Sequence, residues 1–286
     1  MSKKILLTGK NGYVGNHLEN YLVTQGFIVE RISLKNNDWK KLNFEQYEAV
    51  IHLAALVHNN MPNAKIVDYF KINYHLTRQL AEKSKADGVK QFIFFSTMSV
   101  FGLNGALTKK IEIKNDTPCN PQTNYGYSKY FAEKAINAMK SHEFIVNIVR
   151  PPMIYGEGSP GNFSNLIKIA KIMPVYPKIK NDRSVIYIDN LCKHILSLIY
   201  LKVSKTTHPQ NIEYMCTNDV LSILRKQFGK RTIEIPIPKL IVNLIGKINI
   251  AKKIYGNLMY AKDIDEDRSR ILDYTTLEDS IKKTVK

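Results

Sequence analysis

Two residues four positions apart, Tyr125 and Lys129, could carry acid–base chemistry. The residues that follow them read as a helix, and positions i and i+4 lie one above the other on the same helix face. A phenol has a pKa near 10, about three units too high for work at neutral pH. A neighbouring cation favours the phenolate, so we expect Lys129 to lower the pKa of Tyr125 toward the working range. The alternative is a surface helix that carries both residues by chance.

A glycine-rich loop near the N-terminus could bind a dinucleotide. The strand 5–8 leads into Gly9, Gly12 and Gly15, spaced G-x-x-G-x-x-G, and a helical pattern follows. Gly9 allows the turn, Gly12 lets backbone approach a pyrophosphate, and Gly15 lets helix and strand pack closely. The helix N-terminus offers N–H groups to the phosphates. With a second strand at 27–32, this is the βαβ unit of dinucleotide-binding folds, although an ordinary tight turn would need the same glycines.

The elements that position these residues alternate between strand and helix up to residue 150. Such alternation predicts an α/β fold, a Rossmann-type doubly wound parallel sheet with ligands beyond the carboxyl ends of the strands. Gly9, Ala54 and Thr97 all fall at that edge. Further strands are expected at 50–55, 91–96 and 144–149, with helices at about 72–88 and from Tyr125 onward.

The pattern changes after Arg150-Pro151-Pro152, where helical pieces mix with short strands and prolines. We expect a smaller, discontinuous substrate-binding lobe there. The segment 184–191 reads as a strand and helix that return to the main sheet. The predicted dinucleotide-binding domain is 1–155 plus about 184–200, and the predicted substrate lobe is about 156–183 and 201–286.

The composition narrows the class of partner. A net charge of +17 admits nucleic acid, anionic lipid or an anionic substrate. The lysines are spread along the chain without an arginine-rich arm, so nucleic acid is not expected. The three cysteines form no close pair, so we expect neither a disulfide framework nor a metal site, and a cytoplasmic location. No signal peptide or membrane-spanning run is apparent.

One apolar stretch with interspersed lysines, 237–254, fits none of these roles. Such a stretch could lie on an anionic membrane surface. We favour a substrate-lobe helix packed on the core, and membrane association is not expected.

These motifs together resemble the extended short-chain dehydrogenases, the nucleotide-sugar epimerase/dehydratase family. The resemblance covers nearly the whole chain. Two segments, Ala55–Asn60 and Arg150–Gly156, resemble short family members encoded in bacterial capsular polysaccharide clusters. In chain order the matching motifs are Thr8-Gly9-x-x-Gly12-Tyr13-Val14-Gly15, His52-Leu53-Ala54-Ala55, Asn73, Ser96-Thr97-x-x-Val100-Phe101-Gly102, Tyr125-x-x-x-Lys129, Arg150-Pro151-Pro152 and Arg183-Ser184.

The resemblance implies roles for the matching positions. Tyr125 is implied to be the catalytic acid–base, Lys129 to hold the cofactor ribose, and Thr97 to hydrogen-bond the reacting sugar oxygen. Asn73 is implied to support the site or its proton relay, and Arg183 to meet the substrate pyrophosphate. Each residue also has a purely structural alternative. Thr97 could be a hydrogen-bonded hydroxyl at a strand end, Asn73 a polar residue on a helix, and Arg183 a solvated surface charge. The implied cofactor contacts are Thr8, Gly9, Lys10, Asn11, Gly12, Tyr13, Val14, Gly15, Arg31, Ser33, Leu53, Ala54, Ala55, Asn73, Tyr125, Lys129 and Pro151, and the substrate contacts are Thr97, Met98, Ser99, Asn162, Arg183 and His58.

Two departures from the family pattern narrow the reaction. Dehydratases of the family place Asp-Glu directly after the catalytic Thr, where this chain has Met98 and Ser99, so 4,6-dehydration is not expected. NAD-specific members carry an acidic residue after the second strand, where this chain has Ser33 flanked by Arg31 and Lys35. We therefore expect NADP(H) in preference to NAD(H).

The expected function is reduction of the C4 keto group of a UDP-4-keto-6-deoxy-N-acetylhexosamine in bacterial surface polysaccharide biosynthesis. A UDP-sugar 4-epimerase that uses the same residues in both directions is the alternative. A non-catalytic NADP-binding sensor or scaffold is an alternative of another class. The family also implies a homodimer through the helices near 68–85 and 125–140.

Overall fold

The computed structural model describes residues 3–57, 63–265 and 273–285, and the chain divides into two compact units. Thr97, Tyr125 and Lys129, the predicted catalytic residues, all belong to the first unit. The domain boundaries that we predicted from the sequence stay a prediction. The first unit comprises Met1–Gly102, Pro118–Pro151 and Cys192–Pro209, and the second comprises Leu103–Thr117, Pro152–Leu191 and Gln210–Lys286.

A six-stranded parallel sheet forms the centre of the first unit, in the order β10-β6-β4-β3-β1-β2. Thr8 pairs with His52 and Phe95 with Val149, so these strands end at one common edge. The predicted doubly wound parallel sheet is confirmed. The strands are β1 (Lys4–Thr8), β2 (Ile28–Ile32), β3 (Ala49–His52), β4 (Gln91–Phe95), β6 (Ile145–Val149) and β10 (Lys205–Thr207).

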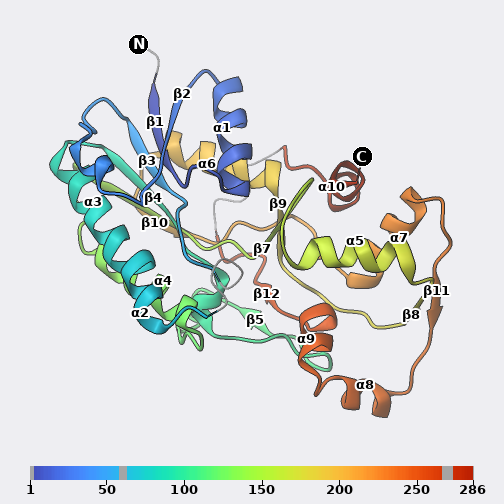
Figure 1. Ribbon diagram of the computed structural model, residues 1–286. Coiled ribbons are helices and arrows are strands. Elements are labelled where there is room, and N and C mark those ends of the chain that lie inside the picture. Colours follow the sequence, from blue (N-terminus) through green and yellow to red (C-terminus); the bar gives the residue numbers. More distant parts are fainter. Residues whose placement is uncertain (1–2, 58–62, 266–272, 286) are drawn as a thin grey trace. The chain divides into compact units, whose positions relative to one another are not determined.

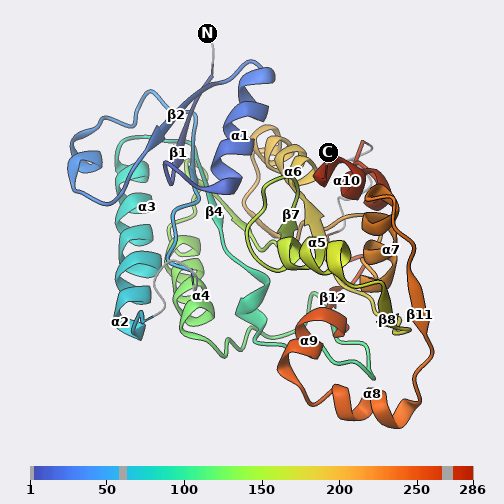
Figure 2. The ribbon, with the colours of Figure 1, turned by 45° about the vertical axis from the view of Figure 1, so that its right-hand side comes forward.

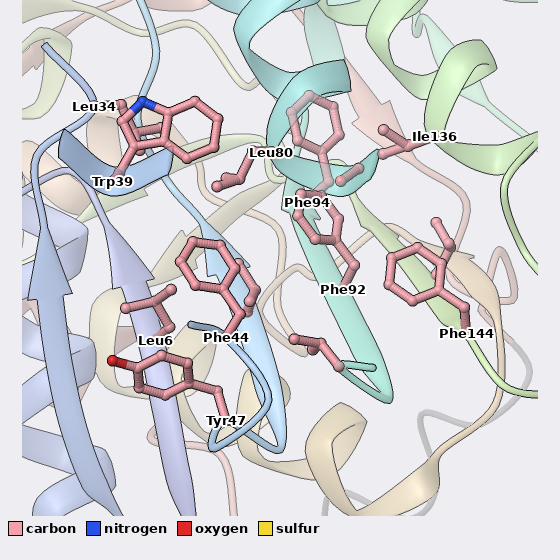
Figure 3. Packing of buried hydrophobic residues seen from close by; sticks show 14 of the residues in the cluster. Leu6, Leu34, Trp39, Phe44, Tyr47, Leu80, Phe92, Phe94, Ile136 and Phe144 are labelled. Carbon is pink, nitrogen blue, oxygen red and sulfur yellow. The ribbon is translucent and has the colours of Figure 1, made fainter. Parts of the chain in front are cut away.

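Helices cover both faces of this sheet. Figures 1 and 2 show α3 (Leu76–Ala86) and α4 (Asn124–Asn137) on one face and α1 (Tyr13–Thr24) and α6 (Ile188–Leu201) on the other. Between the sheet and the α3–α4 layer lies a cluster of buried side chains, drawn in Figure 3, in which Phe92 and Phe94 are fully buried. Each such burial contributes about 1.5–3 kcal/mol. This packing holds the carboxyl end of β4 in place.

The helix predicted at 72–88 begins earlier in the structure, at Ile66, and consists of three segments, the first of which precedes the predicted range. They are α2 (Ile66–Tyr69), the π-helix η2 (Phe70–His75) and α3. Hydrophobic periodicity cannot distinguish a π turn from an α turn, so the π-helix could not be predicted. Turns of this kind are frequent at functional sites. The fully buried Asn73 lies in η2.

The second unit contains small parallel sheets and corrects one expectation. Within the strand and helix predicted at 184–191, the strand does not join the main sheet, because β9 (Val185–Tyr187) pairs with β7 (Met153–Tyr155). A three-residue apolar strand can pair with any parallel neighbour, so the sequence pattern does not determine which strand it pairs with. The main sheet is extended by β10 instead. The other elements are β8 (Val175–Pro177) paired with β11 (Ile233–Ile235), β5 (Glu112–Ile113) paired with β12 (Met259–Tyr260), and helices α5 (Asn162–Ile172), α7 (Thr217–Gln227) and α10 (Leu277–Thr284).

The basic apolar stretch folds as two short helices, α8 (Lys239–Ile245) and α9 (Asn249–Tyr255). One side packs inward, where Val242 and Ile245 contact a cluster formed by Leu107, Ile179 and Tyr255. The other side is exposed, and α8 contains no buried residue. The expected packing on the core therefore holds for one face only. Within the described residues, no helix is both long and apolar enough to cross a bilayer.

Candidate active site

The side chains of Tyr125 and Thr97 meet at the carboxyl edge of the sheet. Thr97 follows β4 and caps the 3-10 helix η3 (Met98–Phe101), its hydroxyl accepting a hydrogen bond from the N–H of Ser99 at 3.1 Å. Tyr125 lies in the first turn of α4, which Thr123 caps. The two side chains are hydrogen-bonded to each other. Two separate motifs of the sequence thus supply the halves of one phenol–hydroxyl pair.

The electrostatics of Tyr125 differ from the expectation. Burial raises the pKa of Tyr125 to about 12, and the hydrogen bond with Thr97 opposes that rise. The predicted lowering of this pKa by Lys129 is therefore wrong for the chain by itself, because desolvation of the phenolate is the larger effect. At neutral pH the phenol is protonated and can donate.

Lys129 is almost completely buried beneath Tyr125, with 1% of its surface exposed. Its Nζ donates to the carbonyl oxygen of Phe95 at 2.6 Å and lies 4.4 Å from the ring centre of Phe94. Burial lowers the pKa of Lys129 to about 7, and Glu133 opposes that fall. The lysine can therefore change its charge near neutral pH.

Glu133 is a residue of this site that sequence reasoning missed. It follows Lys129 by four positions, so the spacing that paired Tyr125 with Lys129 could have found it. Its carboxylate accepts two hydrogen bonds from Arg150, at 3.0 and 2.6 Å, and is 3% exposed. The pair ties α4 to the residue that follows β6.

The side-chain amide of Asn73 is engaged in hydrogen bonds within the protein. Its Oδ1 accepts from the N–H of Leu56 at 2.7 Å, and its Nδ2 donates to the carbonyl of Leu56 and to the hydroxyl of Ser128, each at 3.0 Å. Ser128 in turn donates to the carbonyl of Tyr125 at 2.9 Å. Asn73 thus links Leu56 to helix α4 through Ser128, and its predicted contact with the cofactor and its support of the site stay predictions.

Gly126 is a second residue that sequence reasoning missed. A Cβ at this position would lie 2.8 Å from the carbonyl oxygen of Ser99 and 3.1 Å from Pro121. Only glycine lets the first turn of α4 approach the η3 turn this closely. A glycine in the first turn of the helix, between Tyr125 and Lys129, is the signal in the sequence.

The glycine-rich loop has the shape of a diphosphate cradle. Gly9 has φ +94°, and a Cβ there would lie 3.4 Å from the backbone N of Ala54. Helix α1 begins after Gly12, which has no side chain to cap the N–H groups of the first turn. The hydroxyl of Thr8 accepts from the N–H groups of Leu53 and Ala54, at 3.2 and 3.3 Å, and fixes the two strand ends side by side. These residues fit a dinucleotide.

Arg31 is not the free cation that was expected beside Ser33. Its Nη1 donates to Asn16 at 2.5 Å and pairs with Glu19 at 3.0 Å, and its Nη2 donates to the carbonyl of Gly9 at 2.8 Å. The guanidinium therefore braces the glycine-rich loop. Ser33 accepts a bond from the backbone of Lys35 at 3.3 Å.

Ser96 adds a polar group that fits a bound ligand at the same edge. Its hydroxyl is buried, and among the described residues no hydrogen-bond partner satisfies it. A buried hydroxyl without a partner carries a desolvation cost unless a ligand or water meets it. The residue directly precedes Thr97, where a cofactor or sugar is expected.

The predicted substrate residues are divided between the two units. Met98 and Ser99 lie in η3 beside Thr97, whereas Asn162 opens α5 and Arg183 precedes β9 in the second unit. The Nη1 of Arg183 donates to the carbonyls of Lys252 and Gly256, at 3.3 and 3.1 Å, and burial lowers its pKa. His58 lies outside the described residues.

Comparison with known proteins identifies the class. Residues 5–212 match the NAD dependent epimerase/dehydratase family, and the chain belongs to that family. A UDP-glucose 4-epimerase of Vibrio cholerae is 28% identical, with 90% of this chain and 87% of the relative covered. An N-acetyl-alpha-D-glucosaminyl-diphospho-ditrans,octacis-undecaprenol 4-epimerase of Escherichia coli O157:H7 is also 28% identical, over 68% of this chain and 62% of the relative. The resemblance expected from the motifs is confirmed.

Solved structures agree with this fold. A UDP-glucuronic acid 4-epimerase from Bacillus cereus, in complex with NAD, superposes with a TM-score of 0.72 at 20% identity, covering 98% of this chain and 95% of that one. A dTDP-4-dehydrorhamnose reductase from Bacillus anthracis, in complex with NADP, gives 0.72 at 16% identity over 99% of both chains. Epimerases and reductases thus share this architecture.

Proposed function

We propose that the protein is a 4-epimerase of a diphosphate-linked sugar, with a UDP-hexose or UDP-N-acetylhexosamine as substrate. The hydrogen-bonded pair of Tyr125 and Thr97 beside the glycine-rich loop carries this proposal. Two relatives that are named as 4-epimerases also support the proposal. This preference differs from the reductase expected from the motifs, and that reaction becomes the second candidate.

Each residue of the pair has a part in the reaction. A nicotinamide cofactor would supply the acceptance of hydride from C4 and its return to the opposite face of the keto sugar, which must turn over in the site between the two. To take the proton of the C4 hydroxyl during oxidation, Tyr125 must first be converted to the phenolate, which its raised pKa opposes; as the phenol it returns a proton during reduction. Thr97 donates a hydrogen bond to the same oxygen. Lys129 keeps Tyr125 and the end of β4 in register. Arg183 and Asn162 would bind the substrate, with Arg183 meeting the diphosphate.

The cofactor would lie on the glycine-rich loop. The first turn of α1 would bind its diphosphate, and Leu53, Ala54, Ala55, Ser96 and Pro151 would line its path along the sheet edge. NADP(H) remains our choice, supported by Ser33 in place of a carboxylate, with Lys35 and Lys10 as the cations. Arg31 does not support the choice of NADP(H), because its guanidinium donates hydrogen bonds to Glu19 and to the glycine-rich loop.

A keto-reductase is the second candidate because position 33 lacks the carboxylate expected for tightly held NAD. Its substrate would be a UDP-4-keto-6-deoxy-N-acetylhexosamine, with Tyr125 donating the proton to the forming alkoxide. We do not propose 4,6-dehydration, since Met98 and Ser99 supply no acid–base pair after Thr97. Placement in the cytoplasm and in surface polysaccharide synthesis belongs to the same proposal.

One experiment separates these reactions. The protein is incubated with UDP-glucose or UDP-N-acetylglucosamine and catalytic NAD or NADP, and the sugars are resolved by anion-exchange chromatography and NMR. Interconversion of C4 epimers without net cofactor consumption supports the epimerase. Stoichiometric loss of NADPH absorbance with the 4-keto substrate supports the reductase instead. Neither activity, with intact binding of cofactor, would favour the sensor or scaffold.

A homodimer is proposed through α2, η2 and α4. The ring of Phe131 lies 5.6 Å from that of Phe70, and Phe131 is 44% exposed while Val67 is 69% exposed. These apolar side chains form a patch suited to burial between two copies. Sedimentation velocity of a Phe131→Glu variant should show the monomer, and an unchanged mass would refute this interface.

A further inference from the structure

The outer faces of α8 and α9 expose a group of large apolar side chains within one short stretch. Leu240 is 77% exposed, Leu244 63% and Ile250 68%. Soluble surfaces seldom gather large apolar residues in this way unless something covers them. We call this the α8–α9 surface, formed by Leu240, Ile241, Leu244, Ile248 and Ile250 together with Lys239, Lys247 and Lys253.

The fold of the second unit does not need these side chains. The inward face of the same segment already packs through Val242 and Ile245 against Leu107, Ile179 and Tyr255. That packing holds the two helices in place and leaves the outer residues facing away from the cluster. Both ribbon views draw α8 and α9 next to each other (Figures 1 and 2). The outer residues therefore have a fixed scaffold without a structural role of their own.

The charge around the surface selects the kind of partner. Between residues 230 and 256 the basic side chains are Lys230, Arg231, Lys239, Lys247, Lys252 and Lys253, and the only acidic one is Glu234. A second copy of the chain would bring lysines against lysines, which is unfavourable. Lysines whose alkyl stems lie along apolar groups, with their ammonium ends outward, match the interface of an anionic bilayer.

We propose that the α8–α9 surface docks the protein onto an anionic lipid bilayer, with its isoleucine and leucine side chains at the level of the headgroups and its lysines on the anionic lipids. Docking requires no spanning segment, because short apolar faces can lie in the plane of the interface. The proposal departs from our expectation that this stretch is a substrate-lobe helix packed on the core and that the protein does not associate with membranes. It does not rest on the reaction catalysed.

Vesicle cosedimentation of the full chain tests this directly, without substrate. Vesicles of phosphatidylcholine and vesicles that also contain phosphatidylglycerol are compared at low salt and at about 0.5 M NaCl. We expect sedimentation with the anionic vesicles that falls at least about tenfold in the Leu240→Glu/Leu244→Glu variant. The matched control is Val23→Glu/Ile212→Glu, which places the same charges at sites 53% and 61% exposed and should sediment as the parent does.

A second pair of variants tests the lysines. Lys239→Gln/Lys247→Gln should weaken binding to the anionic vesicles by about fivefold per lysine at low salt, while Lys90→Gln/Lys140→Gln should leave it unchanged. Circular dichroism verifies that each variant is folded. Failure to sediment with anionic vesicles overturns the proposal, as does sedimentation equal to the parent in the Leu240→Glu/Leu244→Glu variant. A lower mass of that variant by ultracentrifugation, without vesicle binding by the parent, would assign the surface to a second copy.

Discussion

The ammonium group of Lys129 donates a 2.6 Å hydrogen bond to the carbonyl oxygen of Phe95, the last residue of β4. Thr97 follows two residues later on the same strand end, and Tyr125 stands one helical turn before Lys129. The bond therefore joins the helix that carries the phenol to the strand that carries its hydroxyl partner. Burial of the ammonium group in the core costs desolvation free energy, and the pKa of Lys129 is lowered for this reason.

The burial of Lys129 predicts a dependence of stability on pH. Its pKa is about 7 in the folded chain and near 10.5 in the unfolded one, so between these values the unfolded chain binds more protons. The free energy of unfolding should rise with pH across this window, by up to about 3 kcal/mol between pH 7 and 9.5. A Lys129→Met variant should lack this rise. Urea titrations of both proteins measure the difference, and parallel curves would contradict the lowered pKa.

Removal of the phenol hydroxyl should abolish most turnover. A Tyr125→Phe variant keeps the ring but cannot transfer a proton, so kcat should fall by about 10²–10⁴ with binding of cofactor retained. Tyr127→Phe is the matched control, because that residue is 39% exposed and lies off the Tyr125–Lys129 face. Rates from coupled assays check both. A fully active Tyr125→Phe protein would remove the catalytic assignment.

The hydrogen bond from Thr97 should be visible in the pH profile. It opposes the rise in the pKa of Tyr125, so Thr97→Val should raise that pKa further. In Thr97→Val the rate of sugar oxidation should therefore rise at a higher pH than in the parent, whereas Thr97→Ser should stay close to the parent. Profiles of kcat/KM from pH 6 upward provide the measurement, and identical profiles for Thr97→Val and the parent would count against the contact.

The close approach at Gly126 predicts a geometric effect. In Gly126→Ala the new methyl would lie 2.8 Å from the carbonyl of Ser99, a backbone atom that cannot move alone. The first turn of α4 must shift, so the Tyr125–Thr97 bond should lengthen and kcat should fall by about tenfold or more. Thermal unfolding should show a loss of about 1–3 kcal/mol. Unchanged kcat and stability would mean that the turn has more room than the structure shows.

The sequence predicted what short-range spacing determines. The i, i+4 relation of Tyr125 to Lys129 and the G-x-x-G-x-x-G loop are local patterns, and the parallel sheet follows from the alternation of elements. The pKa of Tyr125 was predicted in the wrong direction because burial depends on the whole core, which no local pattern reports. The partner of β9, the commitment of Arg31 to Glu19 and the bonds of Asn73 in its π turn depend on residues distant in the chain. The outer face of α8 has the same composition as its inner face, so hydrophobicity alone could not tell which was covered.

The bonds of Arg183 to the carbonyls of Lys252 and Gly256 tie a proposed substrate contact to the end of α9. Its Nη1 is engaged by the carboxyl end of α9, and under the proposed function its remaining donors would meet the substrate diphosphate. Order in α9 and order in Arg183 are therefore linked. Any contact that rigidifies α9 would lower the entropic cost of gripping the diphosphate, and by reciprocity a gripped diphosphate would strengthen that contact. Docking of the α8–α9 surface on a membrane and binding of the substrate diphosphate would then strengthen each other.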